Sequence, residues 1–193
     1  EYDNQQNHVG VEQKKCNNCG DCVTGCNHHA KNTLIMNYLP DAVNHGAEIF
    51  CETGVRYIER RDNKWFVYFN LYNVGREKFD APPLYITADN VIVSAVTLGS
   101  TEILFRSREK GLSVPQALGK QFTGNGDILG FGYNNDVKIN GIGLGKHYDD
   151  KDREPVGPCI TSVIDMRKRE VLDDGMTLEE GSIPGPVSSL LTP

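Results

Sequence analysis

The sequence lacks an apolar run long enough to form a membrane-spanning helix, which needs about 20 such residues. It also lacks an excess of positive charge, because 20 lysines and arginines stand against 26 aspartates and glutamates, a formal net charge of −6. Nucleic acids and anionic membranes present negative charge and attract basic surfaces. We therefore expect no membrane span and no nucleic-acid partner.

The ends of the sequence lack the usual signals of a complete chain. It opens on a polar stretch, Glu1 to Asn7, with no methionine and no secretory signal, and it closes on Ser188 to Pro193 without a terminal element. We expect an internal piece of a longer protein. The 193 residues suffice for one good-sized domain or two small ones.

Cysteine is concentrated in one loop. Four of the six cysteines follow the spacing C-x2-C-x2-C-x3-C, namely Cys16, Cys19, Cys22 and Cys26. Clustering of this kind indicates a local site rather than a secreted disulfide framework, and it favours a reducing, cytoplasmic location.

Three interpretations of this cysteine loop (residues 16–26) stay open. Its spacing matches the bacterial ferredoxin run, so the loop could carry a [4Fe–4S] centre for electron transfer. However, Asn27 stands where that run has proline, and no second run follows. A zinc site is the second interpretation, although structural zinc usually takes two pairs of ligands from separate knuckles. The third is a tight loop without metal, held by packing or by one disulfide.

The first part of the chain predicts an α/β architecture. Helical spacing is found at residues 30–45, with a kink at Pro40, and again at 101–108. Short strands are expected at 47–51, 55–60, 65–72 and 84–87. The continuous apolar run 90–95 suits a strand buried on both faces of a parallel sheet. This order indicates part of a doubly wound nucleotide-binding domain with an inserted β-meander.

The second part of the chain, from about residue 120, contains many glycines and differs in its sequence pattern from the first part. Strand candidates at 128–133, 159–166 and 176–180 are of mixed polarity and separated by turns, which predicts an antiparallel sheet. We therefore expect one domain at 1–120 and a second at 121–193.

The turn from Ala95 to Ser100 can bind a diphosphate through its peptide N–H groups and a helix N-terminus. A complete dinucleotide-binding domain would also contain the G-x-G-x-x-G fingerprint, which is absent.

Three stretches, Cys22–Thr33, Val93–Leu104 and Phe122–Asp127, resemble the glucose–methanol–choline (GMC) oxidoreductases, and most closely their cholesterol oxidase-like branch. The resemblance implies a partial Rossmann-like FAD-binding domain at 1–120 and part of an antiparallel-sheet substrate domain at 121–193. It implies oxidation of an alcohol, such as a sterol, by hydride transfer to flavin, with oxygen or another electron acceptor.

The resemblance also assigns residues to the site. It places the backbone of Val55 near the adenine, the turn containing Ala95, Val96 and Gly99 along the cofactor, and Asn125 and Gly126 beside the isoalloxazine. Glu180 falls where sterol oxidases have a carboxylate that faces the substrate. If buried, that carboxylate could act as a base with a pKa raised by desolvation.

Two departures from the family pattern keep another interpretation open. The family normally has glycine where this chain has Val96, and a β-branched residue resists the positive φ of such a turn and would crowd a cofactor. The glycine fingerprint and a C-terminal His–Asn pair are also absent, so we expect no turnover by this chain alone. The alternative is a non-catalytic remnant that binds no cofactor.

Overall fold

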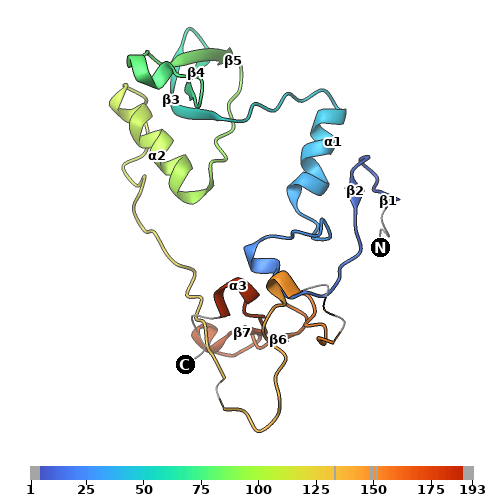
Figure 1. Cartoon of the computed structure of the whole chain (residues 1–193). Helices are drawn as coiled ribbons and strands as arrows, with labels where there is room; N and C mark the ends of the chain where they lie inside the picture. Colours follow the sequence, from blue (N-terminus) through green and yellow to red (C-terminus); the bar gives the residue numbers. More distant parts are fainter. Residues whose placement is uncertain (1–4, 133, 148–149, 151, 189–193) are drawn as a thin grey trace. The chain divides into compact units, whose positions relative to one another are not determined.

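The computed structural model describes residues 5–132, 134–147, 150 and 152–188. The chain forms two compact units: unit 1 comprises Glu1–Glu48 and Phe131–Pro193, and unit 2 comprises Ile49–Gly130. Unit 1 is therefore discontinuous in sequence, and the residues of unit 2 are inserted into it. Figure 1 labels the helices and strands of both units.

Unit 2 contains a three-stranded antiparallel meander. Its strands, in spatial order, are β3 (Thr53–Arg61), β4 (Lys64–Leu71) and β5 (Leu84–Ala88). Asp62 and Asn63 form the β3–β4 turn with φ of 49° and 61°, a left-handed conformation that short polar side chains tolerate. The three strands and the meander expected from the sequence are confirmed.

Aromatic side chains pack across the meander. Tyr57 on β3 stacks on Tyr68 of β4 with ring centroids 4.4 Å apart. The ring centroids of Tyr85 of β5 and Tyr68 are 5.6 Å apart. Cross-strand aromatic pairs of this kind stabilise a sheet beyond the burial of their area.

Helix α2 (Val96–Glu109) packs against β3 and completes unit 2. Ile58 of β3 and Ile103 of α2 are both buried. The hydroxyl of Ser107, which has no exposed surface, accepts a hydrogen bond from the Ile58 N–H at 2.9 Å and donates one to the Ile103 carbonyl at 2.7 Å. The helix therefore satisfies a backbone donor on the free edge of β3.

Two expectations for unit 2 need correction. The run 90–95 is not a strand: it pairs with no strand among the described residues, and Ile92 is 88% exposed. An apolar run becomes a strand only when neighbours satisfy its backbone. The helix expected at 101–108 exists, but it begins earlier, at Val96, directly after this run.

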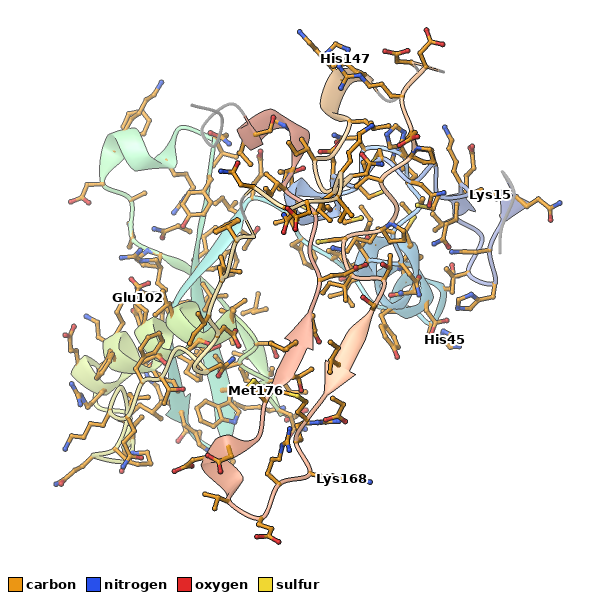
Figure 2. All side chains as sticks on the ribbon, turned by 90° about the horizontal axis from the view of Figure 1, so that it is seen from below. Lys15, His45, Glu102, His147, Lys168 and Met176 are labelled. Atoms are coloured by element: carbon orange, nitrogen blue, oxygen red, sulfur yellow. The ribbon has the colours of Figure 1, made fainter. Side chains whose placement is uncertain are left out.

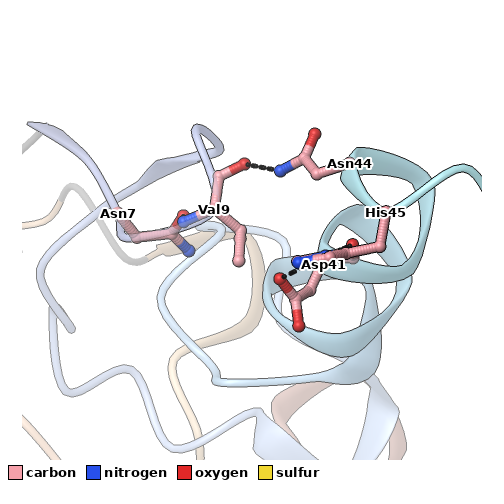
Figure 3. Close-up of polar contacts among 5 residues, drawn as sticks. All are labelled: Asn7, Val9, Asp41, Asn44 and His45. Carbon is pink, nitrogen blue, oxygen red and sulfur yellow. Dashed lines mark hydrogen bonds and ion pairs between the residues drawn. The ribbon is translucent and has the colours of Figure 1, made fainter.

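The first part of unit 1 consists of a small ribbon and one short helix. Strands β1 (Gln5–Gln6) and β2 (Glu12–Gln13) pair antiparallel, and α1 spans Tyr38–Asn44. Figure 3 shows how they are joined: the Asn44 side chain donates to the Val9 carbonyl at 3.1 Å, and His45 lies against Asp41.

The helix expected at 30–45 is interrupted. Residues Leu34–Met36 form a 3₁₀ turn, and the Asn37 side chain accepts a hydrogen bond from the N–H of Tyr38, so that α1 begins only there. Pro40 lies in the first turn of α1, where its missing N–H is not needed, and the expected kink does not arise. Residues 47–51 are also not a strand, since they pair with no described segment.

The C-terminal part of unit 1 contains a small hairpin. Strands β6 (Val163–Asp165) and β7 (Thr177–Glu179) pair antiparallel, as expected, but they are much shorter than the predicted strands at 159–166 and 176–180. Lys168 and Met176 mark the connection between them in Figure 2. Helix α3 (Gly185–Ser188) follows. Residues 128–132 form no strand, and residue 133 of that prediction lies outside the described residues.

Within the described ranges, no helix combines the length and the apolar character that crossing a membrane requires.

Candidate functional site

A pocket of about 490 Å³ lies in unit 2 between β3, the segment 91–95 and the start of α2. Its apolar wall includes Val55 and Ile58 of β3, Val67 of β4, Val91 and Val93 of the segment before α2, and Ile103 of α2. The ladder of β3 shifts register between Val55 and Tyr57, which leaves Arg56 in a bulge beside the pocket. Such bulges redirect side chains next to functional sites.

The pocket brings together three of the six residues that the sequence assigned to the cofactor. Val55, Ala95 and Gly99 all line it, although Val55 is 40 residues and more from the other two. Val96, Asn125 and Gly126 do not line it. Asn125 and Gly126 form an exposed turn with φ of 61° and 76°.

The polar side of this pocket was not predicted from the sequence. Arg106 of α2 forms an ion pair with Glu102 and donates from Nε to the backbone carbonyl of Arg56. The spacing of Glu102 and Arg106 by four residues is a visible sequence signal for the ion pair. The contact with β3 has no such signal, because its partner lies 50 residues away.

The first turn of α2 is suited to an anion. Its N-cap residue, Ala95, makes no side-chain cap, and the first turn contains no acidic residue. The first N–H groups of a helix have no partner within the helix and carry a partial positive charge. An anionic group in the pocket could therefore accept hydrogen bonds from the backbone at this end of α2.

Val96 is the first residue of α2 and adopts a left-handed backbone conformation. Its φ is +59°, which for a β-branched residue is a rare and strained value. The side chain is 83% exposed and is not part of the pocket wall. The valine therefore strains the turn without filling the pocket.

Glu180 lies in unit 1, directly after β7. Its side chain is exposed, and Oε1 accepts a hydrogen bond from the backbone N–H of Thr161 at 3.2 Å. The burial that the sequence analysis required of this carboxylate is absent in this arrangement.

The cysteine loop forms a second pocket, of about 620 Å³, within unit 1. All four cysteines of the loop line it, together with Cys159, and none of them is in a disulfide. Among the described residues, no group of three or more histidine, cysteine, aspartate or glutamate side chains is placed to hold a metal ion. The [4Fe–4S] interpretation of Cys16, Cys19, Cys22 and Cys26 therefore has no support, and we do not assign these residues as metal ligands.

Hydrogen bonds from distant parts of unit 1 fix the shape of the cysteine loop. The carbonyl of Asn18 accepts from the N–H groups of Val156 and Gly157, both at 2.9 Å, and the carbonyl of Cys19 accepts from Leu144 at 2.8 Å. A Cβ at Gly20 would come within 2.7 Å of the Val156 side chain, so only glycine permits this close approach.

Comparison with known proteins identifies the class of this domain. The sequence model of the GMC oxidoreductases matches residues 4–123, more than half of the chain. The chain therefore belongs to the GMC oxidoreductase family, and the matching region is the Rossmann-like, FAD-binding domain of that family. The family expected from the sequence is confirmed. The expected fold class is confirmed as well: mixed helices and antiparallel sheet that form part of such a domain.

The curated relatives are cholesterol oxidases. One from Acinetobacter baumannii is 34% identical over 156 residues, which cover 76% of this chain and 28% of that protein. One from Mycobacterium tuberculosis H37Rv is 36% identical over 110 residues, which cover 53% of this chain and 18% of that protein. The chain thus spans less than a third of the length of these relatives. No solved structure matches it.

Proposed function

We propose that the protein is an FAD-dependent oxidoreductase that oxidises the hydroxyl group of a sterol-like alcohol. The observation that carries this proposal is the pocket in unit 2, which gathers Val55, Ala95 and Gly99 from β3 and the start of α2. Membership of the GMC family supports FAD as the cofactor. The names of the relatives support a sterol-like substrate.

The residues of the pocket fit part of a flavin adenine dinucleotide. The valines of the apolar wall suit the flat face of an adenine, and the uncapped N-terminus of α2 suits the diphosphate. The absence of a side chain at Gly99 keeps the first turn of the helix open. A Cβ at this position would lie 3.1 Å from the Ala95 Cβ, which is a tight contact. When bound, FAD would supply the hydride acceptor for the alcohol carbon.

The remaining assignments follow from the resemblance and are part of the same proposal. Asn125 and Gly126 would lie beside the isoalloxazine, and Glu180 would accept the hydroxyl proton of the substrate. We also propose that this chain divides near residue 120 into part of an FAD-binding domain, 1–120, and part of a substrate-binding domain, 121–193. Oxygen or another acceptor would then reoxidise the flavin.

An absorption spectrum of the full-length protein, purified without oxygen, tests this proposal first. We expect a two-banded flavin spectrum that bleaches when a sterol alcohol is added anaerobically. A flavin spectrum that bleaches only with other alcohols would exclude the sterol assignment. A colourless protein would instead favour the non-catalytic remnant, and a broad charge-transfer band without flavin would favour an iron–sulfur centre.

A further inference from the structure

The pocket of the cysteine loop is lined by five thiols that the proposed flavin chemistry does not use. They are Cys16, Cys19, Cys22, Cys26 and Cys159. The sixth cysteine, Cys51, is exposed and belongs to unit 2. Five oxidisable thiol sulfur atoms therefore line one pocket of the part of the chain that the structure describes.

The sulfur atom of Cys26 has two backbone donors, whereas that of Cys16 accepts one hydrogen bond, from the N–H of Asn18 at 3.3 Å. The Cys26 Sγ accepts hydrogen bonds from the backbone N–H groups of Ala30 and Lys31, at 3.3 and 3.4 Å. The ammonium group of Lys31 is held at the same pocket by a 3.3 Å hydrogen bond to the Cys22 carbonyl. Two donors and a nearby positive charge stabilise a negative sulfur atom.

The pKa values of the thiols follow from these surroundings. Partial burial alone would raise the pKa of Cys26, but the N–H groups of Lys31, Ala30 and His28 and the charge of Lys31 lower it below the ordinary value. Burial raises the pKa of Cys19, the hydrogen bond from the Asp21 backbone N–H opposes this rise, and the charges of Asp21, Cys22 and Cys26 add to it. The Cys26 thiol is therefore the more acidic of the two, and both thiols line the same pocket.

We propose that Cys26 is a peroxide-reactive thiolate and that Cys19 resolves its oxidised form into a disulfide. In the first step the Cys26 sulfur attacks one oxygen of hydrogen peroxide and the O–O bond breaks, which gives a sulfenic acid and hydroxide. In the second step that hydroxide takes the Cys19 proton, and the Cys19 sulfur attacks the Cys26 sulfur, so that the S–S bond forms as the S–O bond breaks. The hydroxide that leaves takes up the proton that Cys26 lost on ionising. Overall, two thiols and one peroxide yield one disulfide and two water molecules.

This site is independent of the flavin pocket, because all of its residues belong to unit 1. Its reaction is therefore expected in protein with and without FAD. A protein that fails to bind flavin can still show the thiol reaction, so the two proposals can be tested separately.

The first test treats the full chain, reduced and then freed of reductant, with hydrogen peroxide in the presence and absence of dimedone. Mass spectrometry of peptides is expected to find a Cys19–Cys26 disulfide without dimedone. Cys19→Ser should instead accumulate the dimedone adduct on Cys26, and Cys26→Ser should lose the fast reaction. Cys51→Ser is the matched control and should react like the unaltered chain.

Two results would overturn the proposal. The first is a rate of peroxide consumption that Cys26→Ser leaves unchanged. The second is a disulfide that still forms in Cys19→Ser, which would exclude Cys19 as the resolving thiol. Circular dichroism of each variant separates a lost reaction from a lost fold.

A second test changes the surroundings of Cys26 and leaves every thiol in place. Lys31→Gln removes the positive charge and is expected to slow alkylation of Cys26 by iodoacetamide several-fold at neutral pH, whereas Lys31→Arg should retain the rate. The plateau of the rate against pH should shift to higher pH in Lys31→Gln only. Identical profiles in both variants would contradict the role given to Lys31.

Discussion

The carboxylate of Asp21 accepts a hydrogen bond from the backbone N–H of Gly185 at 2.7 Å, although 164 positions separate the two residues in the sequence. Its second oxygen accepts from the N–H of Gly145, also at 2.7 Å. The side chain of Asp21 is largely buried. One acidic residue of the cysteine loop thus connects two remote segments of unit 1.

Asp21→Ala is expected to destabilise unit 1, because it leaves the N–H groups of Gly145 and Gly185 without their acceptor. The loss of two hydrogen bonds to a charged group should cost about 3 kcal/mol in the free energy of unfolding. Asp21→Asn keeps one acceptor oxygen and should cost about half as much. Urea denaturation measures both. Asp127→Ala, at an exposed position in unit 2, is the control and should change little.

Val96→Gly is expected to stabilise unit 2. A non-glycine residue in the left-handed region costs about 1–2 kcal/mol, and the greater freedom of glycine in the unfolded chain offsets part of that gain. We therefore expect an increase of about 1 kcal/mol in the free energy of unfolding. Val96→Ala removes the β-branch but keeps the positive φ, so its free energy of unfolding should lie between those of the unaltered chain and Val96→Gly. A lower stability for Val96→Gly would mean that the turn is not strained.

Ser107→Ala is expected to weaken the contact between α2 and β3. The N–H of Ile58 would lose its buried partner, at a cost of about 1–3 kcal/mol. Hydrogen exchange at the Ile58 amide should become faster, and FAD binding should weaken because the pocket lies between these two elements. Ser113→Ala, at an exposed position after the helix, should leave both measurements unchanged.

Gly99→Leu tests whether the pocket in unit 2 holds the cofactor. The leucine side chain would occupy the space beside Ala95, so the FAD content of the purified protein should fall several-fold. The new Cβ would lie 3.1 Å from the Ala95 Cβ, and this tight contact offsets the gain of about 0.5–1 kcal/mol from removing a glycine inside a helix. Urea denaturation of the variant therefore separates a blocked pocket from a lost fold. Gly130→Leu, where a Cβ meets no atom within 4 Å, should retain FAD. Equal FAD content in the two variants would exclude this pocket.

The sequence predicted well what depends on local pattern. Strand β4 and the Asp62–Asn63 turn before it were predicted because their conformations depend on residues that are adjacent in the sequence. The strand is an aromatic and β-branched run, and the turn consists of short polar residues. The prediction of one continuous helix over residues 30–45 was wrong, and the cause is a local contact that the hydrophobic pattern does not reveal. The Asn37 side chain accepts a hydrogen bond from the backbone N–H of Tyr38, so a new helix begins within the apolar pattern.

The parts that could not be predicted depend on contacts between distant residues. The run 90–95 is apolar enough for a buried strand, but hydrophobicity does not tell whether another strand lies beside it. The family resemblance located Val55, Ala95 and Gly99, whereas Arg106 and Ser107 became visible only through their partners on β3. Likewise, the cysteine spacing suggested metal ligands, while the structure distinguishes Cys26 by its backbone donors.

The insertion of unit 2 into unit 1 has a consequence for how the chain folds during synthesis. The contacts of unit 2 lie within residues 49–130, so this unit can fold as soon as it has left the ribosome. The cysteine loop emerges earlier but receives its partners only when Gly145 and Gly185 have been made. Its thiols therefore remain in an unfinished segment of the nascent chain until Gly185 has been made, where a chaperone or a reducing environment would protect them best.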